Sequence, residues 1–223
     1  AANVARALVG ADLAPSKIDI GKLTWEFKQS GTTDVATFVG TTLKNLIGAD
    51  KHKFNPQDVV LYGFGRIGRI AARELVKQAG KGQQLRLRAI VLRTVNDEEV
   101  VKRAALLRND SVHGAFKGAV IEDLPNKAIW VNGQMVKLIA ASNPEDIDYT
   151  EYGIQNALII DNTGVFTKRA DLGRHLKAKG VSKVLLTAPG KEMPNVVYGI
   201  NHKDLDIESE QLFSAASCTT NAI

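Results

Sequence analysis

The stretch 63–68, Gly63-Phe64-Gly65-Arg66-Ile67-Gly68, joins two segments whose patterns predict different secondary structures. Before it, residues 58–63 (DVVLYG) form a short apolar run that is typical of a buried strand. After it, residues 66–78 (RIGRIAARELVKQ) repeat apolar side chains at the spacing of an amphipathic helix. A strand that runs through a Gly-x-Gly-x-x-Gly turn directly into a helix is the opening unit of a dinucleotide-binding fold.

The three glycines of this stretch meet three separate physical requirements. Gly63 permits the tight turn, Gly65 leaves room for the backbone to approach a pyrophosphate, and Gly68 lets the helix pack closely on the strand. The helix N-terminus offers free N–H groups and a partial positive charge to phosphates. A glycine-rich turn without a ligand is the alternative, and the order strand, loop, helix favours a nucleotide.

The remainder of residues 56–223 alternates strand and helix patterns. Strands are predicted at 85–93 and within 157–164, 181–189 and 211–217, and helices at 98–109 and 168–180. Residues 128–139 (AIWVNGQMVKLI) hold an Asn-Gly pair between two apolar arms, which predicts a hairpin with a type I′ turn. The fold class is therefore α/β, a Rossmann-like, doubly wound and mostly parallel sheet.

Residues 1–55 have a different pattern and predict a helical N-terminal extension. Helices are expected at 17–27 and at 35–47, the latter ending at Gly48, with Trp25 and Phe38 on packing faces. A polar break containing Pro56 follows. We therefore place a boundary near Asn55, between an extension of residues 1–55 and a nucleotide-binding domain of residues 56–223.

The end of the second strand bears on the choice of dinucleotide. NAD-binding sites usually carry an acidic residue there to bind the ribose hydroxyls, whereas this strand ends Val91-Leu92-Arg93, with no carboxylate before Asp97. An arginine pairs well with the 2′-phosphate of NADP. NAD and NADP both remain open, because Arg93 could instead be a solvated residue at the strand end.

Composition limits the other function classes. The chain has 29 Lys and Arg against 24 Asp and Glu, a net charge of +5, but the basic residues are scattered and not interleaved with aromatic ones, which disfavours nucleic acid. No apolar run long enough for a membrane span and no secretory leader is visible. A single cysteine fits a reducing compartment, and we expect a cytoplasmic protein.

That cysteine, Cys218, follows a short apolar strand and precedes TTNA, which can begin a helix. A thiolate is favoured at a helix N-terminus, and open α/β sheets bind ligands outside the carboxyl ends of their strands. An inert, buried thiol is the alternative. Together with the glycine loop, an activated thiol indicates hydride transfer from a covalent intermediate.

Six motifs in order resemble glyceraldehyde-3-phosphate dehydrogenase: YGFGRIGR, NDSVHG, DNTGVFTKRADLGRHL, TAPGKE, GINH and SAASCTTNA. The resemblance covers about residues 58–223 and implies the NAD(P)-binding part of such an enzyme, in a bacterial form with an N-terminal extension. It implies that Cys218 attacks an aldehyde carbon to give a thiohemiacetal, which loses hydride to the nicotinamide and becomes a thioester that inorganic phosphate attacks.

The same resemblance assigns the remaining site residues. Ser217 and Thr219 would bind phosphate, and no metal is implied. The residues that would bind the cofactor are Gly63, Phe64, Gly65, Arg66, Ile67, Arg93, Asn162, Thr163, Gly164 and Phe166. The sequence departs from the family's E-S-T-G-V-F at Asp161 and Asn162, and from its NAD-specific members at Leu92 and Arg93.

The family's general-base histidine lies in a substrate domain that this sequence lacks, so the resemblance implies an inactive piece of an enzyme that forms a homotetramer. Erythrose-4-phosphate dehydrogenase shares these motifs and is a second reading. A nucleotide-binding or interaction module, docking through its helical extension, is a third.

The four histidines are expected to play no catalytic part. His113 and His202 are interpreted as loop residues satisfied by backbone, His113 with no carboxylate partner, and His52 and His175 as surface residues.

Overall fold

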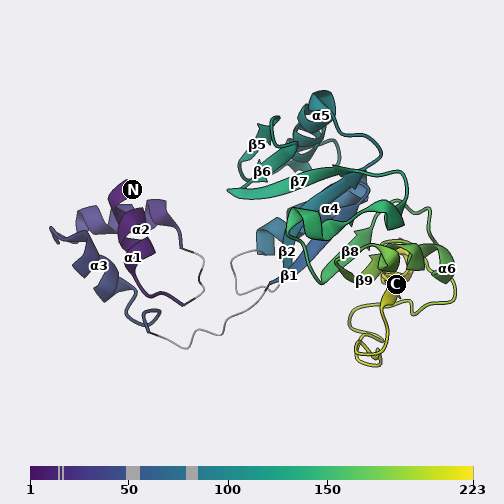
Figure 1. Cartoon of the computed structure of the whole chain (residues 1–223). Coiled ribbons are helices and arrows are strands. Elements are labelled where there is room, and N and C mark those ends of the chain that lie inside the picture. Colours follow the sequence, from purple (N-terminus) through teal and green to yellow (C-terminus); the bar gives the residue numbers. More distant parts are fainter. Residues whose placement is uncertain (15, 17, 49–55, 79–84, 223) are drawn as a thin grey trace. The chain divides into compact units, whose positions relative to one another are not determined.

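The computed structural model describes residues 1–14, 16, 18–48, 56–78 and 85–222 (Figure 1). The chain forms two compact units, one of Ala1–Asn55 with Gln78–Gln84 and one of Pro56–Lys77 with Leu85–Ile223. The boundary predicted near Asn55 lies outside the described residues. Within the described part, none of the helices combines the length and the apolar character that a membrane span requires.

The described residues of the first unit form three short helices, α1 (Ala2–Gly10), α2 (Ile20–Gln29) and α3 (Val35–Thr42). Asp19 and Asp34 cap α2 and α3 by accepting hydrogen bonds from backbone N–H groups of the first turn. A small core holds them together, in which Phe27 and Phe38 meet edge to face at 5.3 Å. Its buried members are Val4, Leu23, Phe38 and Val39.

Two expectations about this unit are wrong in detail. Helix α3 ends at Thr42 instead of continuing to Ile47, which forms a bridge with Leu13. Gly40 and the β-branched Thr41 and Thr42 have low helix propensity, which accounts for the early end. Trp25 is 63% exposed and lies outside the buried core, whereas Phe38 is buried as expected.

The second unit contains an eight-stranded sheet in the order β10-β9-β8-β1-β2-β7-β6-β5 within the described residues. All neighbours from β10 to β7 are parallel, and β7-β6 and β6-β5 are antiparallel. This confirms the mostly parallel, Rossmann-like α/β class. The strands are β1 (Gln57–Tyr62), β2 (Leu85–Leu92), β5 (Val120–Asp123), β6 (Ala128–Val131), β7 (Gln134–Ala140), β8 (Ala157–Asp161), β9 (Val181–Leu186) and β10 (Leu212–Ser214).

Alternation along β1 separates two hydrophobic cores. Val59 and Leu61 belong to the core that includes residues of α4 (Arg66–Gln78) and α5 (Asp97–Arg108). Val60 and Tyr62 belong to the other core, which includes residues of the 3₁₀ helix η2 (Tyr149–Tyr152) and of α6 (Arg169–Leu172). Both faces of the central strand are therefore covered, as in a doubly wound sheet.

The predicted hairpin is confirmed. Asn132 and Gly133 both have positive φ, 49° and 82°, as a type I′ turn requires, and Val131 pairs with Gln134 across it. The helix expected at 168–180 is shorter, since α6 ends at Leu172 and the 3₁₀ helix η3 (Gly173–Lys177) replaces its second half. A glycine in mid-helix weakens the α form, and this change of helix type decides where His175 lies.

The remaining elements are short. They are the strands β3 (Asn109–Asp110) and β4 (Gly114–Ala115), the 3₁₀ helix η1 (Pro144–Asp146) and the helix α7 (Cys218–Ala222).

Candidate functional site

The glycine loop has the geometry that its sequence predicts. Gly63 has a φ of +87°, and a Cβ there would lie 2.9 Å from the Thr163 side chain. A Cβ on Gly68 would lie 2.5 Å from the carbonyl oxygen of Gly63, which is too close for any side chain. A Cβ on Gly65 would meet no atom within 4 Å. Gly63 and Gly68 are thus required by the fold, whereas nothing in the part of the chain that the structure describes requires Gly65.

A cavity of about 300 Å³ opens beside this loop, where β1, β2, β7 and β8 end. Strand β1 lies between β2 and β8 in the sheet, so this is the point at which the chain reverses the direction of strand addition. Ligands of open α/β sheets bind at such a point. The cavity is lined by Tyr62, Gly63, Phe64, Gly65, Val91, Leu92, Arg93, Thr94, Glu99, Arg103, Ala141, Ser142, Thr163, Val165 and Phe166.

The charged residues of the cavity favour an anion. Arg103 forms an ion pair of 2.6 Å with Glu99, and hydrogen bonds from Lys102 and Arg103 hold the pKa of Glu99 below its usual value. Arg93 directly follows β2 and is exposed, and within the described residues its side chain has no hydrogen bond or ion pair. The cavity wall thus contains two arginines and one carboxylate. Because the carboxylate is paired with Arg103, the charge of Arg93 is available to a ligand.

The turn after β8 supplies another wall. The Asp161 carboxylate accepts hydrogen bonds from the backbone N–H (2.8 Å) and the hydroxyl (2.7 Å) of Thr163, which lines the cavity. The Asn162 side chain donates to the Ile160 carbonyl at 2.9 Å and turns its polar end toward the backbone, and Gly164 has a positive φ of 68°. Asn162 and Gly164 therefore shape the turn without lining the cavity.

His175 is buried, and its interpretation as a surface residue is wrong. Its exposed fraction is 0%, and its Nε2 lies 2.9 Å from Oδ2 of the equally buried Asp161. Helix η3 turns it inward, whereas a continuous helix over 168–180 was expected. A pattern of apolar spacing gives no sign of a polar side chain that enters the core to meet a carboxylate.

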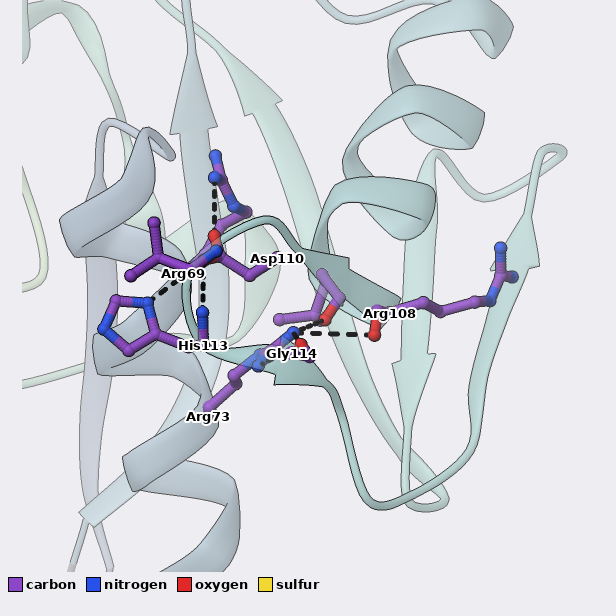
Figure 2. A network of polar contacts seen from close by, with 8 residues as sticks. Arg69, Arg73, Arg108, Asp110, His113 and Gly114 are labelled. Carbon is purple, nitrogen blue, oxygen red and sulfur yellow. Dashed lines mark hydrogen bonds and ion pairs between the residues drawn. The ribbon is translucent and has the colours of Figure 1, made fainter.

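His113 also has a carboxylate partner, contrary to expectation. Its Nδ1 lies 3.0 Å from Asp110, whose carboxylate also accepts the backbone N–H groups of Val112 and His113. Arg69 of helix α4 completes this network, which Figure 2 shows. His202 accepts a hydrogen bond from the backbone of Gly199, as expected of a loop histidine, and His52 lies outside the described residues.

Cys218 is exposed and is the first residue of α7. Ser217 caps this short helix, since its hydroxyl accepts the backbone N–H of Thr220 at 3.0 Å. Ala216, two residues before the thiol, has a left-handed φ of 59°, a conformation that costs a non-glycine residue about 1 kcal/mol. Cys218, Ser217 and Thr219 do not line the cavity, and their chemical roles stay predictions.

Arg66 and Ile67 are exposed at the start of α4 and do not line the cavity either. Sequence reasoning missed several residues that do, including Thr94, Arg103 and Ser142. Thr94 follows the predicted end of the second strand, which is a signal that could have identified it. Ser142 follows β7, whose parallel pairing with β2 the sequence did not predict. Arg103 lies one helical turn from Glu99, and neither residue is conspicuous in the sequence.

A family model described as "Glyceraldehyde 3-phosphate dehydrogenase, NAD binding domain" matches residues 57–169. The chain belongs to the glyceraldehyde 3-phosphate dehydrogenase family. The match contains the glycine loop and the turn after β8, so the part of the chain that builds the cavity is the family's NAD-binding domain. The resemblance seen in the sequence motifs is thereby confirmed.

Individual members of the family align over different lengths. A "Glyceraldehyde-3-phosphate dehydrogenase-like protein" of Pseudomonas aeruginosa is 45% identical over 223 residues, 99% of this chain and 48% of that protein. Glyceraldehyde-3-phosphate dehydrogenase of Lactococcus lactis is 36% identical over 167 residues, 74% of this chain and 45% of that protein. "Glyceraldehyde-3-phosphate dehydrogenase A, chloroplastic" of Zea mays is 40% identical over 167 residues, 74% of this chain and 39% of that protein. The chain thus spans half or less of the length of these relatives.

Proposed function

We propose that this chain is the NAD(P)-binding and cysteine-bearing part of a phosphorylating glyceraldehyde-3-phosphate dehydrogenase. The observation that carries the proposal is the glycine loop with open space at Gly65, beside a cavity at the reversal point of the sheet. Open space at a glycine that the fold does not require is what close approach of a pyrophosphate needs.

The residues around the cavity fit a dinucleotide. The backbone N–H groups of the loop and of the first turn of α4 are the donors for the pyrophosphate. Thr163, Val165 and Phe166 provide one wall, and Val91 and Leu92 an apolar floor for an adenosine. When bound, NAD or NADP supplies the acceptor for the hydride that leaves the substrate.

Arg93 favours NADP over NAD in this proposal. The guanidinium is free of any acidic partner in the described residues, and the one carboxylate among the residues that line the cavity, Glu99, is paired with Arg103. A 2′-phosphate would find an unpaired arginine there, whereas a ribose diol would find in the cavity lining only a carboxylate already paired with Arg103. NAD use would require Arg93 to point away from the nucleotide.

Cys218 is the nucleophile of the proposed reaction. Its Sγ adds to the aldehyde carbon of glyceraldehyde 3-phosphate to form a thiohemiacetal, and loss of hydride from that carbon gives a thioester. Inorganic phosphate, bound by the hydroxyls of Ser217 and Thr219, then displaces the thiol to give an acyl phosphate. The exposed thiol and the strained backbone at Ala216 support this role, because such strain gathers at functional sites.

Other parts of the proposal concern the whole protein. We propose a homotetramer in the cytoplasm, whose residues beyond this sequence supply the general base, so that the chain alone binds nucleotide without turnover. Residues 1–55 would form a helical extension and residues 56–223 the nucleotide-binding domain. Erythrose 4-phosphate is the alternative substrate, and competing substrate assays on the whole enzyme separate the two.

Calorimetric titration of this chain with NADPH and NADH in the same buffer tests the proposal. We expect both to bind, NADPH at least about tenfold more tightly, a difference of about 1.4 kcal/mol. Equal or tighter binding of NADH would instead assign the protein to the NAD-linked type. Binding of neither would contradict the proposed function.

A further inference from the structure

A buried polar pair lies directly behind the dinucleotide cavity and has no part in the function proposed so far. It consists of His175 and Asp161, both with 0% of their side chains exposed, and Nε2 of the histidine is 2.9 Å from Oδ2 of the aspartate. Removing both groups from water is costly unless each is paired. Apolar side chains would fill the core at lower cost, so we ask what else this pair does.

The two carboxylate oxygens of Asp161 have different hydrogen-bond partners. Oδ1 accepts both the backbone N–H and the hydroxyl of Thr163, which lines the cavity. Oδ2 is occupied by His175. A carboxylate can only accept, so we assign the imidazole proton to Nε2. Nδ1 of His175 is buried without a hydrogen-bond partner among the described residues. The His175 side chain thus has one polar contact among the described residues, with Asp161. The Asp161 carboxylate in turn holds the turn after β8 through Thr163.

The imidazole ring also supports two other walls of the cavity. Tyr62 packs edge to face on it with ring centroids 4.6 Å apart, and Phe166 does the same at 5.7 Å. Both aromatic residues line the cavity. Burial raises the pKa of the Tyr62 hydroxyl, and the Asp161 charge raises it further, as expected for a carboxylate held close by in apolar surroundings.

We infer that His175 is a positioning residue for nucleotide binding, which holds the turn at Thr163 through Asp161 and supports Tyr62 and Phe166 from behind. Thr163 is in turn the side chain that a Cβ on Gly63 would meet at 2.9 Å, so the turn and the glycine loop pack directly together. A shift of the turn would therefore reach the loop that is proposed to receive the pyrophosphate. The inference rests on the proposed function for its ligand.

Three variants separate positioning from a general contribution to the core. His175→Phe keeps an aromatic ring against Tyr62 and Phe166 but leaves Oδ2 of Asp161 without its donor. His175→Gln restores an N–H donor near the place of Nε2. Val184→Ala is the matched control, because Val184 is fully buried in the same core and does not line the cavity.

The experiment titrates NADPH and NADH into each folded variant and also measures hydrogen exchange of the Thr163 amide without nucleotide. We expect His175→Phe to weaken binding about tenfold, since an unpaired buried carboxylate oxygen is costly, and to speed Thr163 exchange. His175→Gln should recover most of the nucleotide affinity and most of the slow exchange at Thr163. Val184→Ala should lower the melting temperature without changing the affinity or the exchange rate. Wild-type affinity and exchange in His175→Phe, or an equal loss in Val184→Ala, would overturn the inference.

The exchange measurement also keeps the two proposals apart. If the wild-type chain bound neither nucleotide, the proposed function would fail. Faster Thr163 exchange in His175→Phe alone would then still support the hold of His175 on the turn, and unchanged exchange would refute it.

Discussion

Arg69 and Asp110 form an ion pair of 2.9 Å in which the carboxylate is almost fully buried and the guanidinium is 13% exposed (Figure 2). The pair joins helix α4, which begins at the glycine loop, to the end of strand β3 in the β3-β4 hairpin. Arg73, one turn further along α4, donates to the carbonyls of Leu107 and Gly114 and strengthens the same connection. The helix that would receive the pyrophosphate is thus fixed to the end of α5 and to the β3-β4 hairpin.

Asp110→Asn is therefore expected to destabilise the fold, because it leaves a shielded guanidinium without its countercharge. We expect the melting temperature followed by circular dichroism to fall by at least about 4 °C. Lys77→Met is the control, since the ion pair of Lys77 with Glu74 is exposed on both sides and such pairs contribute little. Equal melting temperatures of the two variants would show that the Arg69 pair is not structural.

Two glycines of the loop should respond differently to alanine. Gly68→Ala would place a Cβ 2.5 Å from a backbone oxygen, so we expect it to lower the free energy of unfolding by about 1–3 kcal/mol. Gly65→Ala meets no atom of the protein and should leave stability within about 0.5 kcal/mol. Its methyl group would stand where the pyrophosphate is proposed to approach, so dinucleotide affinity should fall at least about tenfold. Urea unfolding and calorimetry measure the two effects separately, and a Gly65→Ala chain that binds normally would argue against the proposed pose.

The contrast between these glycines and His175 shows what the sequence could reveal. The loop, its strand and its helix were predictable because turn chemistry and apolar period act over a few neighbouring residues. His175 was not, because its burial depends on a helix that changes type at Gly173 and on Asp161, 14 residues away. The short β5 was missed for the same reason, since its pairing with β6 decides it. The Arg103–Glu99 pair is local, one helical turn apart in α5, and only its place in the cavity wall depends on tertiary structure.

The Glu210 carboxylate should make the free energy of unfolding depend on pH below about 4.5. Hydrogen bonds from Arg169, both 2.9 Å long, and then from the backbone of Leu212 and Gln211 lower the pKa of Glu210 to about 2. A depressed pKa means that the stabilisation is present above the unfolded value of about 4.3 and is lost as the pH falls toward 2. We expect Glu210→Gln to be less stable than wild type by about 1 kcal/mol at pH 7, because Arg169 is partly exposed.

Urea unfolding at pH 7, 4.5 and 3 measures this gap, which should narrow steadily below pH 4.5. Glu208→Gln, at an exposed position two residues earlier, should show no such dependence. A gap that stayed constant between pH 7 and pH 3 would mean that the Glu210 carboxylate is not stabilised by Arg169.

Arg93→Asp tests the choice of dinucleotide. The substitution removes the unpaired guanidinium and introduces a carboxylate that would repel a 2′-phosphate and accept hydrogen bonds from a ribose diol. We expect NADPH affinity to fall at least about tenfold and NADH affinity to hold or rise. Lys203→Asp makes the same charge change at an exposed position that does not line the cavity. It should change the affinities for NADPH and NADH only slightly and by the same factor. Parallel changes in both affinities for Arg93→Asp would exclude a contact with the 2′-phosphate.

Cys218 is the one cysteine of the sequence and is exposed, which makes its proposed role simple to test. Iodoacetamide should add a single carbamidomethyl group to the folded chain without denaturant, and mass spectrometry should place it on Cys218. In the full-length enzyme, Cys218→Ser should reduce phosphate-dependent turnover at least about 1,000-fold, because an alcohol replaces the thiolate nucleophile. Nucleotide binding should be retained, since Cys218 does not line the cavity, and this shows that the variant is folded. Turnover near the wild-type rate would exclude covalent catalysis by this thiol and with it the thioester mechanism.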